Sequence, residues 1–184
     1  LYEVAGGNPE TLRGDKEGKM KLDGKSFYAT LNGKPKEVRD YVYGVHTTRG
    51  IKNGSDNYPV RSIQDHEYKL IWNLQFNEPF LSSGSQPKNK LYGSWLRATN
   101  VTPKQAEHAK LYRNRPEFEL YNIKKDVYEL DNLADDAKLA TVKIKLLSEL
   151  KKWMLDQGDK GIKTEAEALR RLKGDTLDWK NSGD

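Results

Sequence analysis

The fold that this sequence predicts is decided by residues 41–80, which read YVYGVHTTRGIKNGSDNYPVRSIQDHEYKLIWNLQFNEPF. Two runs in this stretch, 41–48 and 58–73, are rich in β-branched and aromatic residues and are bounded by Gly, Asn, Asp and Pro, which is typical of strands. Charged residues at 65–67 interrupt the second run. The stretch therefore predicts two extended segments, and the surest strand within them is 66–73.

A polar loop, residues 49–57, separates the two runs and contains Gly, Asn, Ser and Asp with two basic residues. Binding residues concentrate on polar loops that a rigid sheet carries. His46 precedes this loop, and Arg49 and Arg61 flank it. A guanidinium offers a planar fork of donors that suits sulfate, phosphate and carboxylate oxygens, although either arginine can equally pair with an aspartate of this stretch. His46 is either a strand-end histidine satisfied by a neighbour or a polar group directed at a ligand.

The C-terminal half of the chain predicts a long helix. Residues 137–156 repeat apolar side chains every three or four positions, and Gly158 ends the pattern. Shorter elements are expected before and after it, namely a helix within 93–100, a helix over 102–114 that opens with Thr102 and Pro103, a strand over 117–123 and a helix over 165–174. The predicted fold class is α+β, in which a small antiparallel sheet packs against a long C-terminal helix.

Composition excludes several classes of function. The 184 residues include no cysteine, which excludes disulfides, zinc–thiolate sites and cysteine nucleophiles within this chain. No run of about 18 apolar residues occurs, so no membrane association is expected. The net charge of +5 favours anionic partners, but acidic residues are interspersed with basic ones, so no nucleic-acid partner is expected. The three histidines lack metal-binding spacing, and no phosphate loop or Gly-x-Ser-x-Gly elbow is present.

Three segments resemble a known family. Residues 117–136, EFELYNIKKDVYELDNLADD, resemble the E-L-Y-D-L-x-x-D-P-x-E-x-x-N-L-A signature of type I sulfatases, and depart from it at Asn122 and Val127. The positions in register are Glu119, Leu120, Tyr121, Asp126, Glu129, Asn132, Leu133 and Ala134. Residues 22–27, LDGKSF, resemble a further sulfatase element, and residues 58–80 resemble the strand pair of heparan N-sulfatases (sulfamidases).

The resemblance implies that the catalytic groups lie elsewhere. Type I sulfatases use a Cys or Ser converted to formylglycine, beside a calcium ion that Asp and Asn side chains hold. This chain has no cysteine, and its only x-x-P-x-R segment, residues 57–61, begins with an asparagine that cannot become formylglycine. The resemblance therefore identifies the chain with the C-terminal subdomain of an alkaline-phosphatase-like sulfatase fold. The calcium site of the full-length enzyme is expected outside this chain, and the isolated chain is expected to be inactive.

In the family this subdomain adds loops to the rim of the substrate pocket. Carried over to this chain, that role selects His46, Thr47, Thr48 and Arg49 as substrate-binding residues. The implied division is 1–40 as the end of a catalytic-domain helix and a connector, 41–160 as the subdomain, and 161–184 as a helix and tail.

The resemblance also implies partners. The expected ones are a sulfated glycan of heparan type, the N-terminal catalytic domain missing from this chain, and a second copy of the fragment through self-association. The implied compartment is periplasmic or secreted, in a bacterium. Two alternatives stay open: a sulfatase of other specificity, such as one for a 6-O-sulfated amino sugar, and a stand-alone carbohydrate-binding module. Such a module would show a row of exposed aromatics on one sheet face, whereas Trp72, Trp95 and Trp153 fall on different elements and are expected in the core.

Overall fold

The computed structural model describes residues 1–13, 24–34, 39–47, 51, 54–55, 57–86 and 88–168. These residues belong to two compact units, Leu1–Asp40 and Tyr41–Asp184. The second unit holds the whole β-sheet and the long helix, and it is the unit in which the candidate site lies.

The first unit opens with a hydrogen-bonded turn that stops at Gly6. The amide of Gly6 donates to the carbonyl of Glu3 and the amide of Gly7 donates to that of Tyr2, both at 3.0 Å. Gly6 has φ 86°, the left-handed conformation that closes a helical turn and that glycine adopts without strain. Two short helices follow, η1 (Pro9–Thr11) and α1 (Tyr28–Leu31).

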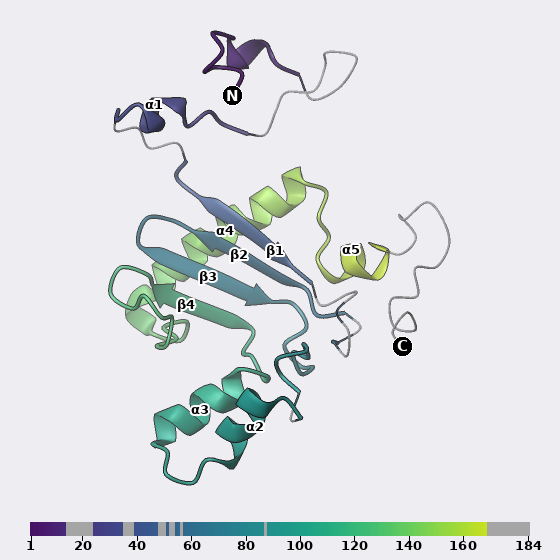
Figure 1. Cartoon of the computed structure of the whole chain (residues 1–184). Coiled ribbons are helices and arrows are strands. Elements are labelled where there is room, and N and C mark those ends of the chain that lie inside the picture. Colours follow the sequence, from purple (N-terminus) through teal and green to yellow (C-terminus); the bar gives the residue numbers. More distant parts are fainter. Residues whose placement is uncertain are drawn as a thin grey trace. The chain divides into compact units, whose positions relative to one another are not determined.

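The second unit is built on a four-stranded antiparallel sheet (Figure 1). Its strands lie in sequence order, β1 (Val42–His46), β2 (Val60–Gln64), β3 (Tyr68–Asn73) and β4 (Phe118–Asn122). The second extended run is a hairpin of two strands. It turns at the charged break because the Asp65 carboxylate accepts hydrogen bonds from the amides of Glu67 and Tyr68, at 2.8 and 2.7 Å. A side chain that bonds its own backbone in this way favours a turn over a continuous strand.

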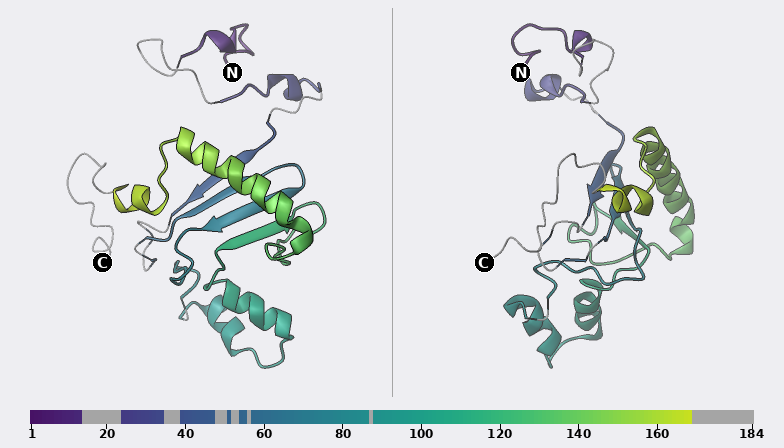
Figure 2. Two further views of the ribbon diagram at one scale, coloured as in Figure 1. Left: turned by 180° about the vertical axis from the view of Figure 1, so that it is seen from behind. Right: turned by 90° about the vertical axis from the view of Figure 1, so that its right-hand side faces the viewer.

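The hydrophobic core lies between one face of the sheet and α4 (Ala140–Asp156), which crosses that face diagonally (Figure 2). Ile63, Leu70 and Leu120 occupy neighbouring positions on three strands, and all three are fully buried. The helix contributes Leu146, Leu150 and Met154, and each such burial stabilises the fold by roughly 1.5–3 kcal/mol. Trp153 stacks on Tyr43 of β1, with ring centroids 4.7 Å apart. The predicted α+β class is confirmed.

Two helices lie in the chain segment that connects β3 to β4. The first is α2 (Lys90–Arg97), which starts three residues before the expected segment because the Asn89 side chain caps it. The second is α3 (Pro103–Leu111), whose capping box between Thr102 and Gln105 confirms the predicted N-cap. Trp95 of α2 is 43% exposed, so its expected place in the core is wrong.

The last described elements flank α4. They are η2 (Ala137–Leu139), capped by Asp136, and α5 (Ile162–Ala166), which begins three residues before the expected helix. Residues 169–174 of that expected helix lie outside the described residues. Within the described ranges, no helix is both long and apolar enough to span a bilayer.

Candidate functional site

The polar loop after β1 is joined to the segment that follows β3 through Ser55. Its amide donates to the carbonyl of Leu81 at 3.0 Å, and its hydroxyl donates to the carbonyl of Pro79 at 2.7 Å. The Leu81 amide returns a bond to the same hydroxyl at 2.9 Å. Gly54 lies so close to this segment that a Cβ there would approach the Leu81 carbonyl oxygen to 3.1 Å. The two loops therefore form one clamped unit at this end of the sheet.

Phe80 lies at the centre of that unit. Its ring centroid is 5.8 Å from that of His46 and 5.3 Å from that of Tyr58. The guanidinium of Arg115 lies over the same ring at 4.9 Å, within the range of a cation–π interaction. The Phe80 amide donates to the carbonyl of Arg113 at 2.7 Å, which fixes its backbone. Phe80 therefore holds an imidazole and a guanidinium on one side of the sheet.

The structure describes two of the four predicted substrate-binding residues. His46 ends β1 with its side chain exposed and its ring against Phe80. Thr47 follows it and is half-buried. Thr48 and Arg49 lie outside the described residues. His46 therefore packs on a neighbouring ring while its side chain is exposed, and its contact with a ligand stays a prediction.

Arg61 is internal, so its candidacy as a ligand-binding residue is corrected. Its side chain is 1% exposed, and Nε lies 2.5 Å from Oδ2 of Asp159 while Nη2 lies 2.9 Å from Oε1 of Glu165. Burial lowers the pKa of Arg61, but its bonds to the two carboxylates outweigh this and raise it. Arg61 does not pair with an aspartate of residues 41–80, as the sequence suggested. Both of its partners lie about 100 residues further along the chain.

The pKa of Asp159 moves in the opposite direction. Burial raises it, yet the bonds from Arg61 and from the Gly161 amide lower it below its ordinary value of 3.8. The segment 57–61 that superficially matches x-x-P-x-R is a loop–strand junction, as expected, and its Arg61 belongs to an ion-pair cluster that the sequence did not predict.

Behind Phe80 lies a buried polar cluster centred on Glu119. Its carboxylate accepts from Asn73 Nδ2 at 2.7 Å and from the Tyr121 hydroxyl at 2.6 Å, and Nη1 of Arg115 lies 3.4 Å away. Burial is the main cause that raises the pKa of Tyr58 to about 12 and raises that of Tyr121 further. Both phenols therefore stay protonated at physiological pH.

Arg115 is the site residue that the sequence did not reveal. Its side chain is 28% exposed, and its Nε has no hydrogen-bond partner among the described residues. The only signal was the alternation of Arg113 and Arg115 just before the expected strand. Nothing in that pattern placed either residue beside the loop after β1.

The sulfatase-like signature forms a turn that hydrogen-bonds along the outer edge of β4. Asn132 accepts from the Leu120 amide at 2.9 Å and donates to the Phe118 carbonyl at 3.1 Å. Asp126 accepts from two backbone amides at 2.7 and 2.8 Å. Glu129 pairs with Lys69 at 2.9 Å and holds a positive φ of 54°. These residues shape the backbone, so the departures at Asn122 and Val127 leave the turn intact.

The calcium that the resemblance implies does not fit the described part of the chain. Among the described residues, no group of three or more His, Cys, Asp or Glu side chains is arranged to hold a metal ion. The acidic groups beside the site are already committed, Glu119 to its three donors and Asp159 to Arg61. Among the described residues, the site offers hydrogen-bond donors and the partly exposed Arg115 guanidinium for binding an anion.

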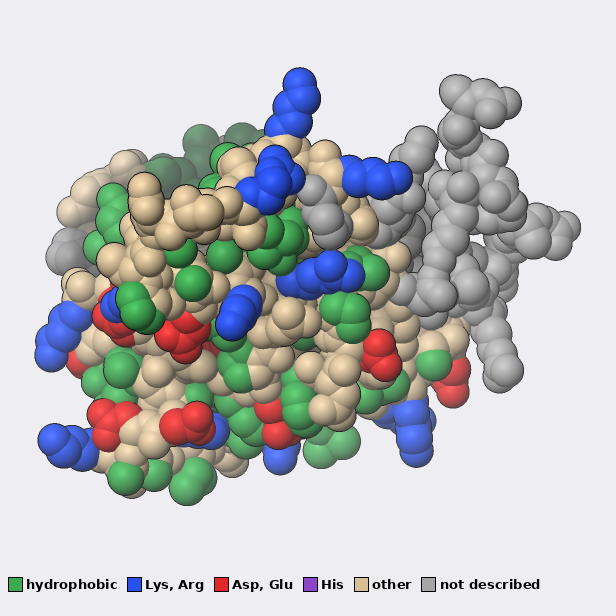
Figure 3. All heavy atoms as spheres, turned by 90° about the horizontal axis from the view of Figure 1, so that it is seen from below, with side chains coloured by type: hydrophobic (Ala, Val, Ile, Leu, Met, Phe, Trp, Pro, Cys, Tyr) green, Lys and Arg blue, Asp and Glu red, His purple; other side chains and the backbone are tan. Residues whose placement is uncertain are grey.

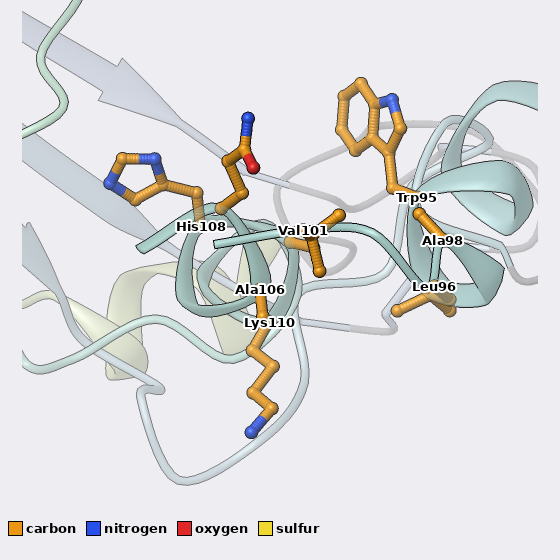
Figure 4. A pocket seen from close by; sticks show the side chains of 9 residues that line it. Trp95, Leu96, Ala98, Val101, Ala106, His108 and Lys110 are labelled. Atoms are coloured by element: carbon orange, nitrogen blue, oxygen red, sulfur yellow. The ribbon is translucent and has the colours of Figure 1, made fainter. Parts of the chain in front are cut away.

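A separate hollow of about 460 Å³ lies between α2 and α3. Its lining is mostly apolar, with Trp95, Leu96 and Val101 around it, and Lys110 is directed away from it (Figure 4). The face seen from below carries acidic and basic side chains interspersed with apolar ones (Figure 3). This mostly apolar hollow suits hydrophobic contact.

The sequence of this chain is similar to those of known sulfatases. An ulvan-active sulfatase of Formosa agariphila is 36% identical over 160 residues, which is 86% of this chain and 28% of that protein. Human N-sulphoglucosamine sulphohydrolase is 27% identical over 140 residues, which is 75% of this chain and 27% of that protein. No protein-family model matches the chain.

A crystal structure of a Bacteroides thetaiotaomicron protein assigned to the sulfatases shares the fold. It matches with a TM-score of 0.52 and 19% identity, over 98% of this chain and 27% of that chain. The chain spans about a quarter of the length of each of these proteins. Over most of its length, this chain is homologous to sulfatases.

Proposed function

We propose that this chain is the C-terminal subdomain of an enzyme that hydrolyses a sulfate ester or sulfamate on a sulfated glycosaminoglycan sugar. The nucleophile and the calcium site belong to the catalytic domain, and this chain forms part of the substrate-pocket rim. The observation that carries the proposal is the clamped loop after β1, in which Phe80 holds His46 and Arg115 on one side of the sheet.

The proposed roles follow from the chemistry of the side chains. His46 and Arg49 donate to sulfate or carboxylate oxygens, while Thr47 and Thr48 bond sugar hydroxyls. Arg115 places a partly exposed guanidinium over the Phe80 ring, on which His46 also packs. The Arg115 Nη1 also pairs with Glu119 at 3.4 Å, so an anionic ligand would share this charge with that carboxylate.

The substrate proposed first is an N-sulfated glucosamine unit of heparan type. The support is the similarity of residues 58–80 to heparan N-sulfatases, together with the human N-sulphoglucosamine sulphohydrolase among the relatives. The second candidate is an O-sulfated sugar, because the relative with 36% identity is an ulvan-active sulfatase. In both cases the proposed compartment is periplasmic or secreted.

The test is sulfate release by the full-length enzyme from N-sulfoglucosamine, from glucosamine 6-O-sulfate and from ulvan. We expect release from N-sulfoglucosamine, dependent on calcium, and none from the isolated 184-residue chain. Release from an O-sulfated substrate alone would keep the sulfatase and remove the N-sulfatase assignment. Release by the isolated chain would overturn the placement of the nucleophile.

A further inference from the structure

A groove of about 470 Å³ lies between the end of α4 and the turn that leads into α5. It is called the basic groove here, and its charged lining consists of Lys151, Lys160, Lys163 and Asp159. Trp72 of β3 forms part of its wall, and the Nζ of Lys151 lies 5.4 Å from that ring. The rest of the lining is apolar, with Met154 among its members.

The positive charge of the basic groove is not cancelled within it. Its single carboxylate, Asp159, is turned to Arg61, with the 2.5 Å contact described above. Among the described residues, none of the three lysines forms an ion pair. Three ammonium groups above an apolar wall are complementary to a ligand that carries several anionic groups on a less polar frame.

The wall that carries two of these lysines is fixed in place. The Lys160 amide donates to Oγ1 of Thr164 at 2.7 Å, and the Gly161 amide donates to Asp159 Oδ1 at 2.8 Å. Gly161 has φ 63°, and a Cβ there would lie 3.4 Å from Leu74. Binding therefore orders only the lysine side chains, which lowers its entropic cost.

The basic groove and the loop after β1 are at the same end of the sheet. The register sets His46 opposite Val60 and Val60 opposite Asn73, while Arg61 pairs with Trp72 one position further in. Trp72 belongs to the face that α4 covers, and His46, by strand alternation, to the opposite face. A polymer bound at the loop can thus continue around this end of the sheet towards the groove.

We propose that the basic groove binds an anionic segment of a sulfated polysaccharide. The proposal rests on the proposed function for the identity of the polymer. The groove itself depends only on the lysines, the apolar wall and the fixed turn between Asp159 and Thr164.

The test measures heparin binding to the chain carrying Lys160→Gln and Lys163→Gln together. The matched control is Lys124→Gln with Lys125→Gln, two exposed lysines on the turn after β4. Titration at low salt should show affinity weakened roughly threefold to tenfold in the groove variant, as expected for two solvent-exposed charge contacts, and no change in the control. The circular dichroism melting curve of each variant checks that folding is kept.

Two results would contradict the proposal that the basic groove binds a sulfated polysaccharide. One is an equal loss, or no loss, in the two double variants. The other is double-stranded DNA of matched charge binding as tightly as heparin with the same loss, which would make the site a general anion surface. Turnover of N-sulfoglucosamine by the full-length enzyme should not change in the groove variant. Absence of sulfate release by the unmodified enzyme from N-sulfoglucosamine, glucosamine 6-O-sulfate and ulvan alike would refute the proposed function, while the heparin titration would still decide the groove.

Discussion

Two arginines at the same end of the sheet have opposite surroundings. Arg61 lies on the face that α4 covers, is 1% exposed and is closed by two carboxylates. Arg115 lies on the other face, is 28% exposed and rests on the Phe80 ring. The guanidinium closed by two buried carboxylates maintains the fold, whereas the one that lies over a ring and pairs with the single carboxylate of Glu119 stays partly exposed. The surroundings of the two arginines thus distinguish the part of this chain that maintains the fold from the part proposed to contact substrate.

The largest effect is expected from Arg61→Ala. The substitution leaves the carboxylates of Asp159 and Glu165 buried without their partner, which costs roughly 3–5 kcal/mol in the free energy of unfolding. Urea unfolding of the chain measures it, with Arg97→Ala on the exposed side of α2 as the control. Equal stability of the two variants would mean that the ion-pair cluster does not hold α5 to the sheet.

Acid should weaken the same cluster. The pKa of Asp159 is lower in the folded chain than its ordinary value of 3.8, so its contribution to stability is present above that value. It is lost as the pH falls through the lower, folded pKa, because the unfolded carboxyl group then binds the proton more readily. On acidification from pH 6 to about pH 2, the melting temperature should fall more steeply in the unmodified chain than in Asp159→Asn, with the difference appearing below about pH 4. Parallel curves would contradict this.

A smaller effect, on function instead of stability, is expected from Phe80→Leu in the full-length enzyme. Loss of the ring removes the support of His46 and Arg115, so KM should rise roughly threefold to tenfold, the factor that about 1 kcal/mol of lost positioning gives. The kcat should stay within about twofold, since the reacting groups lie elsewhere. Phe76→Leu, on an exposed loop residue, is the control. A fall in kcat with unchanged KM would contradict a positioning role.

The smallest effect concerns self-association of the isolated chain. Trp95, Leu96 and Val101 are 43%, 48% and 40% exposed around the hollow between α2 and α3, and exposed apolar patches favour association. Sedimentation velocity at increasing concentration should show a weak dimer that Trp95→Ser reduces. A monomer at every concentration would show that the isolated chain does not self-associate.

The sequence predicted the elements better than the contacts between them. Periodicity located α4, the capping residues located α3, and the alternation of apolar residues located β3 and β4. The turn at Asp65 was visible as a charged break, but the hairpin depended on hydrogen bonds from its carboxylate to two amides. Trp95 was wrongly expected in the core because it is a large apolar residue. The sequence does not show that its helix, α2, leaves this side chain exposed.

The candidate site was predictable only where it is local in sequence. His46 and its loop follow from the end of a strand, and the structure places His46 on Phe80. Arg115 and the partners of Arg61 come from other parts of the chain, brought together by strand pairing and by the turn after α4. No local pattern encodes such contacts, because they depend on the register of the sheet.

The central claim is that the loop after β1 contacts substrate. Steady-state kinetics of His46→Ala and Arg49→Ala in the full-length enzyme test it most directly, with N-sulfoglucosamine as substrate. Each variant should raise KM about tenfold or more, as the loss of a charge-assisted hydrogen bond of about 1.5–3 kcal/mol requires, with a folded-state melting temperature like that of the unmodified enzyme. Unchanged KM and kcat in both variants would contradict the claim and leave the loop with a purely structural role.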